Sequence, residues 1–301
     1  MINKKPLAGI ILALTLFFWA SAYVAIRVAE HSFSPGALGF FRYAIAALIM
    51  GPVYCLIPNK TKISRMDGFL IFISGAIGIG IYNVAVNQGE LVVPAAMAAF
   101  IVASMPVVSS IGAAIFFKER ITWIGILGLI ISFTGVAVIA LSQGSLHLSF
   151  TMGVGSLLFA VICAVFYNLM QKKLLRKFRA LELSCLCILS ACLIQIVFLP
   201  AGLNQIHQAN ISSVLAVLFL GVFPAAFSYL GYTYALTYFS ITRTTASLFA
   251  MPFITLVIGW IVLGEKLPWI ALIGGILTLM GPFLIFKYGA LKSLPKGSRS
   301  L

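Results

Sequence analysis

Residues 106–139 read PVVSSIGAAIFFKERITWIGILGLIISFTGVAVI, and residues 252–285 read PFITLVIGWIVLGEKLPWIALIGGILTLMGPFLI. The two stretches align without a gap at an offset of 146 residues. The aligned pairs are Pro106 with Pro252, Glu119 with Glu265, Trp123 with Trp269, Gly128 with Gly274 and Gly135 with Gly281. A repeat of this length in a chain of 301 residues indicates two similar halves.

The composition indicates that the solvent of this chain is lipid. Hydrophobic residues make up 62% of the chain and charged residues only 9%, whereas soluble domains average about 45–50% and about 25%. The net charge of +14 comes from basic residues in short segments between apolar runs. That pattern is typical of membrane topology, so we expect a lipid-bilayer environment and no nucleic-acid partner.

Runs of about 20 apolar residues, the length of a membrane-spanning helix, can be marked off by turn residues and charges. The expected helices cover residues 7–29, 35–57, 68–88, 91–117, 121–142, 151–172, 181–200, 211–236, 240–263 and 268–287. The sequence therefore predicts an all-α polytopic membrane protein with ten transmembrane helices. The apolar run that follows Lys4 and Lys5 is interpreted as the first of them and not as a cleaved signal peptide.

Loop charge predicts the orientation of these helices. If the N-terminus is cytoplasmic, 17 of the 20 basic residues fall on the cytoplasmic side and only Arg27 and Lys266 on the outer side. Both termini are therefore predicted to be cytoplasmic. Glu119 and its repeat mate Glu265 then lie on opposite sides of the membrane, so the halves, residues 1–143 and 144–290, are inverted repeats, followed by a basic tail at 291–301. Inverted repeats are typical of secondary transporters.

The spacing Pro–x12–Glu–x3–Trp–x4–Gly–x6–Gly that closes each half resembles the EamA domain of the drug/metabolite transporter superfamily. The likeness extends to Phe18-Trp19-Ala20-Ser21, to Phe41-Arg42 and to Asn87-x-Gly89-Glu90. The resemblance covers nearly the whole chain, although the second half has Cys163 where the first has Trp19. It implies a metabolite carrier of a bacterial inner membrane, often an exporter, with a central cavity and alternating access. It does not name the cargo, because members carry amino acids, nucleosides, sugars and cofactor-like molecules.

Arg42 is expected about 10 Å below the outer surface, seven residues into its helix at about 1.5 Å per residue. A charge at that depth needs a partner or a water-filled cavity. Glu90, at the outer end of the third helix, is the expected partner. Two interpretations stay open. The pair is either a structural link between helices, or Arg42 meets a substrate carboxylate or forms part of an outer gate.

Polar and aromatic side chains recur at mid-membrane depth, where they must face the interior of the bundle. The residues predicted to bind substrate are Trp19, Tyr23, Arg42, Tyr82, Asn83, Asn87, Tyr167, Asn168 and Tyr232. The alternative for each is a hydrogen bond that merely joins two helices. The aromatic walls and the few charges suit a zwitterion such as an amino acid.

The repeated prolines and glycines have both structural and functional interpretations. Pro106 and Pro252 are predicted hinges, with static bends as the alternative. The glycine pairs, seven residues apart on one helix face, serve packing within the bundle or a dimer face, so the chain is predicted to be a monomer or homodimer. Glu119 and Glu265 are predicted to cap the helices that directly follow them.

Catalytic chemistry finds no support in the sequence. His31, His147 and His207 fall in outer loops without metal-binding spacing, and the five cysteines lie in apolar runs. We therefore expect no catalytic residue, metal or cofactor. The leading hypothesis is a secondary transporter that exports a small polar metabolite, an amino acid or a related compound, by alternating access. Exchange of a nucleoside or cofactor-like metabolite is the alternative, and a membrane-embedded transferase is the alternative from another class.

Overall fold

Ten apolar helical spans dominate the chain, in a computed structural model that describes residues 4–91, 100–142, 152–263, 268–288 and 290–291. In the first half the elements are α1 (Lys5–Glu30), α2 (Pro35–Leu56), α3 (Arg65–Gly75), η1 (Ala76–Ile81), α4 (Tyr82–Glu90), α6 (Met105–Phe117), β1 (Arg120–Ile121) and α7 (Trp123–Ser142). In the second half they are α8 (Met152–Leu174), α9 (Ala180–Gln195), η2 (Ile196–Phe198), α10 (Leu199–Ile206), α11 (Ile211–Leu220), η3 (Gly221–Phe227), α12 (Ser228–Tyr238), α13 (Ile241–Ala246), η4 (Ser247–Ala250), α14 (Met251–Leu263), α15 (Trp269–Tyr288) and β2 (Ala290–Leu291). The prediction of an all-α membrane protein with ten spanning helices is confirmed.

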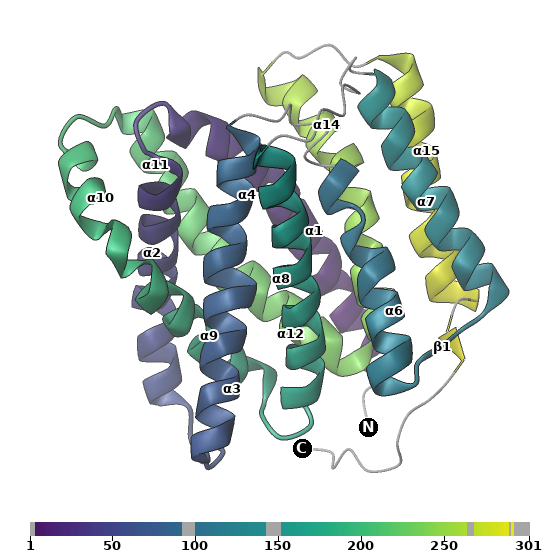
Figure 1. Cartoon of the computed structure of the whole chain (residues 1–301), viewed down its shortest axis with the longest axis horizontal. Coiled ribbons are helices and arrows are strands. Elements are labelled where there is room, and N and C mark those ends of the chain that lie inside the picture. The colour runs from purple at the N-terminus through teal and green to yellow at the C-terminus, as the bar shows by residue number, and fades with distance from the viewer. Residues whose placement is uncertain (1–3, 92–99, 143–151, 264–267, 289, 292–301) are drawn as a thin grey trace.

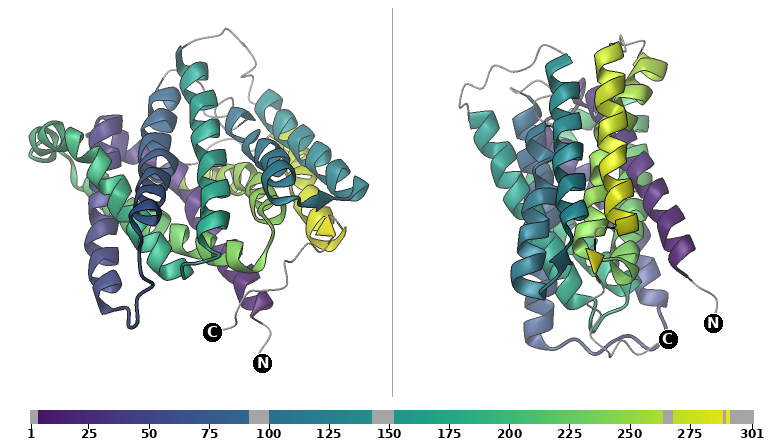
Figure 2. Two further views of the ribbon diagram at one scale, coloured as in Figure 1. Left: turned by 60° about the horizontal axis from the view of Figure 1, so that its bottom comes forward. Right: turned by 90° about the vertical axis from the view of Figure 1, so that its right-hand side faces the viewer.

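The helices stand side by side as one bundle (Figures 1 and 2). They form because the runs are apolar and because a helix satisfies its own backbone hydrogen bonds, which lipid cannot do. Large apolar side chains face outward, among them Trp123 at 81% exposure and Trp269 at 69%. Such exposure would be a liability in water, and it indicates that lipid surrounds the bundle.

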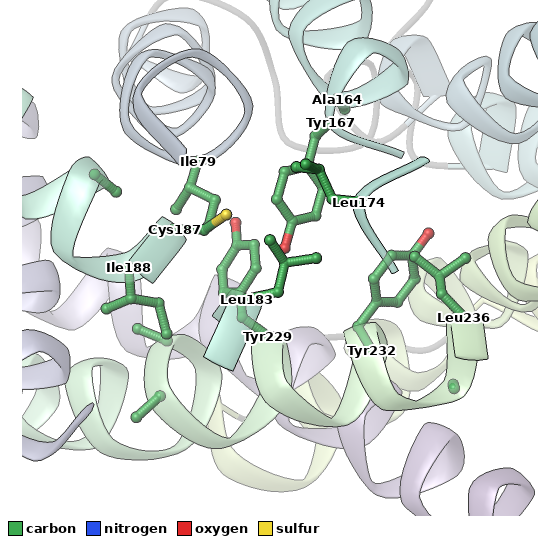
Figure 3. Close-up of a cluster of buried hydrophobic side chains, with 14 of the residues drawn as sticks. Ile79, Ala164, Tyr167, Leu174, Leu183, Cys187, Ile188, Tyr229, Tyr232 and Leu236 are labelled. Carbon is green, nitrogen blue, oxygen red and sulfur yellow. The ribbon is translucent and has the colours of Figure 1, made fainter. Parts of the chain in front are cut away.

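The interior is packed where α2, α8, α9 and α12 meet. Tyr43, Leu183, Ile188 and Leu236 are almost completely buried there, and Figure 3 shows part of this cluster. Several tyrosines belong to the same cluster, so the apolar core passes directly into a polar and aromatic region. That region forms the wall of the cavity described below.

The third spanning helix of each half contains a π-helical segment. η1 separates α3 from α4, and η3 separates α11 from α12. The segments end at Ile81 and Phe227, which the 146-residue offset of the repeat makes equivalent. Gly75 and Gly221, equivalent by the same offset, let each helix pack on the other half, because a Cβ at either would strike Cys187 or Ile45. π-helical turns are rare and occur often at functional sites.

Helices α7 and α15 lie against each other and run in opposite directions (Figure 1). A Cβ on Gly135 would lie 2.6 Å from the Gly274 carbonyl oxygen, and one on Gly128 would lie 2.9 Å from that of Gly281. The repeated glycines therefore serve packing within the bundle, as one of the two interpretations predicted. Ser132 donates a hydrogen bond (3.3 Å) across this contact to the carbonyl of Thr278, the residue equivalent to it in the repeat.

Two short features extend the predicted spans. The helix expected to end at residue 200 continues through a 3-10 turn and α10 to Ile206. It continues because Pro200 occupies the first turn of α10, where the missing N–H costs nothing. After α15, Ala290 and Leu291 pair with Ile121 and Arg120 as a two-residue antiparallel ladder. This ladder holds the start of the predicted tail beside the loop that follows α6.

Candidate functional site

A cavity of about 190 Å³ lies at the centre of the bundle, among α1, α2, α4, α8, α12 and α14. All nine side chains predicted to bind substrate are on its wall: Trp19, Tyr23, Arg42, Tyr82, Asn83, Asn87, Tyr167, Asn168 and Tyr232. The volume is below the roughly 300–1,000 Å³ typical of sites for drug-sized ligands. It therefore suits a small metabolite.

The described lining of the cavity extends toward one side of the bundle. Arg27, Asn87, Ile139 and Gly259 line it, and each lies in the last turns of α1, α4, α7 or α14. Those helix ends are opposite the side on which α1 begins and α15 ends (Figure 1). Toward that second side, which we call the terminus side, Ala113 and Leu236 are buried in the core. Packed core therefore lies between the described part of the cavity and the terminus side.

Arg42 is buried in α2 and belongs to a hydrogen-bonded chain. Its Nη1 donates to Asn83 Oδ1 (3.1 Å), and Asn83 Nδ2 donates to the Ile79 carbonyl (2.9 Å) and to the Tyr229 hydroxyl (3.2 Å). The hydroxyl of Tyr43 donates to that of Tyr229 at 3.4 Å. Arg42 Nε has no hydrogen-bond partner among the residues that the structure describes. Arg42 thus contributes a buried cation to the cavity wall, with its Nε enclosed in the protein interior.

The expected pairing of Arg42 with Glu90 stays a prediction. Glu90 is the last residue of α4, and its side chain lies outside what the structure describes. The described partner of Arg42 is the neutral amide of Asn83. Sequence spacing did not indicate this pair, because it depends on which faces of α2 and α4 turn toward each other.

Asn168 centres a second network in the cavity wall. Tyr232 donates its hydroxyl hydrogen to Asn168 Oδ1 at 2.9 Å, and Asn168 Nδ2 donates to Ser109 Oγ at 3.1 Å. All three residues are almost fully buried. This chain links α12, α8 and α6, so residues of both halves of the sequence fix the same wall.

Aromatic rings separate the two networks. The rings of Trp19 and Tyr229 lie edge to face at 5.3 Å, and Trp19 packs on Tyr232 at 5.2 Å. Tyr167 meets Tyr229 edge to face at 5.9 Å (Figure 3). Tyr229 was not among the predicted binding residues, although it precedes Tyr232 by three residues and so shares its helix face. That periodicity would have identified it.

The remaining predicted residues occupy distinct parts of the wall. Tyr23 and Tyr82 are half-buried. Asn87 Nδ2 donates to the Pro35 carbonyl (3.2 Å), whereas its Oδ1 has no partner in the described part of the chain. Pro106 and Pro252 are the second residues of α6 and α14 and also line the cavity. Their predicted role as hinges stays a prediction.

The described lining contains two arginines, several amides and hydroxyls, and no carboxylate. No group of three or more histidine, cysteine, aspartate or glutamate side chains comes together among the described residues. The groups present can bind a ligand by charge, hydrogen bonds and ring faces, all of which form and break reversibly. A central cavity of this kind within ten spanning helices is typical of membrane transporters.

The profile of the EamA-like transporter family matches residues 7–141 and again residues 151–287, and the chain belongs to this family. The "Probable terminal-alkyne amino-acid exporter" of Streptantibioticus cattleyicolor is 33% identical over 278 residues, which cover 91% of each chain. The "Uncharacterized transporter YdfC" of Bacillus subtilis is 28% identical over 89% of this chain and 87% of its own. The inner membrane transporter YedA of Escherichia coli, also uncharacterized, is 24% identical over the same shares.

A crystal structure 13% identical in sequence superimposes with a TM-score of 0.75, over 93% of this chain and 96% of its own. At that identity it shows the fold alone. The family and its inner-membrane relatives identify the chain as a multi-pass transporter of the inner membrane.

Proposed function

We propose that this transporter exports a small amino acid, or a related metabolite with a free carboxylate, by alternating access. The observation that carries the proposal is Arg42, a buried cation on the cavity wall whose Nε has no partner among the described residues. A guanidinium recognises a carboxylate through charge-assisted hydrogen bonds. The name of the relative in Streptantibioticus cattleyicolor, a probable amino-acid exporter, supports the same cargo class.

The rest of the cavity suits the remainder of such a molecule. Trp19, Tyr167, Tyr229 and Tyr232 offer ring faces that attract an ammonium group and pack on an apolar side chain. The lining carries no carboxylate among the described residues, so a cationic side chain would lack a counter-ion there. An amino acid with a neutral side chain fits these groups best.

The arrangement of the halves supports alternating access. α7 and α15 are equivalent in the repeat and meet antiparallel, as two inverted halves require. Such an arrangement permits one half to rock against the other, which opens the central cavity alternately to each side of the membrane. With the termini in the cytoplasm, as loop charge predicts, the cavity faces outward in this structure, which is the state that releases an exported substrate.

Counterflow of labelled compounds into proteoliposomes tests the cargo. We expect uptake of neutral amino acids and little uptake of their methyl esters, nucleosides or cofactor-like compounds. Arg42→Gln should raise the amino-acid concentration that gives half-maximal counterflow by about 10- to 100-fold, as expected for the loss of a charged hydrogen bond. It should also abolish the preference for the amino acid over its methyl ester. Arg65→Gln, at an exposed position, is the matched control. Equal transport by Arg42→Gln and wild type would refute the proposal.

A further inference from the structure

Two charged side chains bracket the turn between α12 and α13 on the terminus side. The Glu119 carboxylate accepts hydrogen bonds from the Ile241 N–H (2.9 Å), the Thr242 N–H (3.3 Å) and the Thr242 hydroxyl (3.0 Å). The Lys172 ammonium donates to the Leu236 and Phe239 carbonyl oxygens at 2.6 and 2.7 Å. The carboxylate thus meets the N-terminus of α13 and the ammonium the C-terminus of α12.

Both placements match the helix dipoles. The first N–H groups of a helix carry partial positive charge and its last carbonyls partial negative charge, and a charged cap of the opposite sign stabilises each end. Glu119 and Lys172 also lie close enough to attract each other. The prediction that Glu119 caps the next helix in sequence is wrong, because Thr122 occupies that position with a 3.1 Å bond from the Gly125 N–H.

The contacts join parts of the chain that are far apart in sequence. Glu119 follows α6 in the first family match, and α13 belongs to the second. Lys118 ends α6 in the left-handed conformation (φ 55°), which redirects the chain so that the next side chain reaches α13. Lys172 lies one turn beyond Asn168, on α8. The two charges therefore sit directly between the cavity wall and the terminus side.

We propose that Glu119 and Lys172 form the gate that closes the cavity on the terminus side, an inference that rests on the proposed alternating access. The gate is shut in this structure by the five hydrogen bonds to the α12–α13 turn. Opening of this side separates α13 from the α6 loop and α12 from α8. Each separation exposes helix ends that the two charges otherwise satisfy, so the gate sets the free-energy difference between the two states.

Ala113 provides a probe of opening that needs no substrate. It is fully buried on α6, between the cavity residue Pro106 and Glu119. The five native cysteines are replaced by alanine, Ala113→Cys is introduced, and the protein is placed in lipid nanodiscs, where reagent reaches both sides. The rate of reaction with a charged maleimide then reports the fraction of molecules that are open on the terminus side.

Glu119→Gln and Lys172→Met should each raise this rate by about tenfold, the effect expected for loss of a charged helix cap. Glu182→Gln is the matched control, because that carboxylate also accepts from the N–H and hydroxyl of a threonine, Thr61 (2.8 and 2.9 Å), at a different helix junction. Its labelling rate should equal that of the parent. Thermal unfolding of each variant shows that the fold is intact.

The proposal is overturned if both gate variants, intact by unfolding, label at the parental rate, or if Glu182→Gln raises the rate equally. The outcome is independent of the cargo. Faster labelling without amino-acid counterflow would leave the gate in place and remove the cargo proposal. Amino-acid counterflow with unchanged labelling would remove the gate proposal and leave the cargo proposal in place.

Discussion

At the scale of a single residue, Tyr229 links the Arg42 network to the aromatic rings of the cavity wall. Its hydroxyl holds Asn83, which in turn holds Arg42, and its ring packs against Trp19 and Tyr167. Asn83 is therefore fixed on both sides, by its neighbouring carbonyl at Ile79 and by this hydroxyl. The orientation of the guanidinium depends on a residue that contributes no charge of its own.

Replacement of Tyr229 by phenylalanine should raise the concentration of a carboxylate substrate that gives half-maximal counterflow by about two- to tenfold. This is the cost of losing the hydrogen bond that holds Asn83 in place. Maximal counterflow should change little, because the ring and its packing remain. Tyr234→Phe is the control, since the one described hydrogen bond of that hydroxyl goes to Tyr238 on the same helix at 3.5 Å. Unaltered half-saturation in Tyr229→Phe would show that Asn83 holds Arg42 unaided.

The two π-helical segments matter at the scale of elements because they present backbone carbonyls to side chains. The Ile79 carbonyl receives Asn83, the Gly80 carbonyl receives Gln195 (2.8 Å) and the Pro224 carbonyl receives Trp19 Nε1 (2.9 Å). Trp19 and Asn83 both line the cavity. The helix register of both third helices is thus tied to residues that a bound substrate would touch.

Gly75→Ala tests how tightly the first of these helices is held. The added Cβ would strike the Cys187 backbone oxygen, and such overpacking costs about 1–3 kcal/mol or more. Gly9→Ala is the matched control on α1, where nothing lies within 4 Å, and it should stabilise by about 0.5–1 kcal/mol. Thermal unfolding in detergent measures both. A Gly75→Ala protein as stable as wild type would mean that α9 moves away freely.

At the scale of the whole molecule, the amino-acid pattern accounts for the spans because membrane insertion depends on run length and composition, both local properties. The same reasoning identified the nine cavity residues, since polar side chains in lipid turn inward. The hydrogen-bond partners of these residues could not be predicted from the sequence. Arg42 bonds Asn83 and Glu119 caps α13 because of helix rotation and proximity across the halves, which no sequence spacing encodes. For the π-helical segments, the glycines within and beside them are the only indication that the sequence offers.

The orientation predicted from loop charge can be tested on the native protein. Cys55 is exposed at the end of α2, on the terminus side, whereas Cys163, Cys185 and Cys187 are buried. We expect an impermeant maleimide to modify Cys55 in inverted membrane vesicles and to leave it intact in right-side-out vesicles. Cys55→Ser identifies the labelled site. The opposite pattern would place the termini outside and reverse the proposed direction of release.

The ladder between Arg120 and Leu291 has a practical consequence for biosensor construction. Arg120 directly follows Glu119 in the chain, so its two-residue strand attaches the C-terminal segment to the backbone of the gate. A fluorescent reporter fused shortly after Leu291 is mechanically coupled to that backbone and shares its displacement. Its signal would follow the conformational cycle in real time, without a label inside the membrane and without knowledge of the cargo.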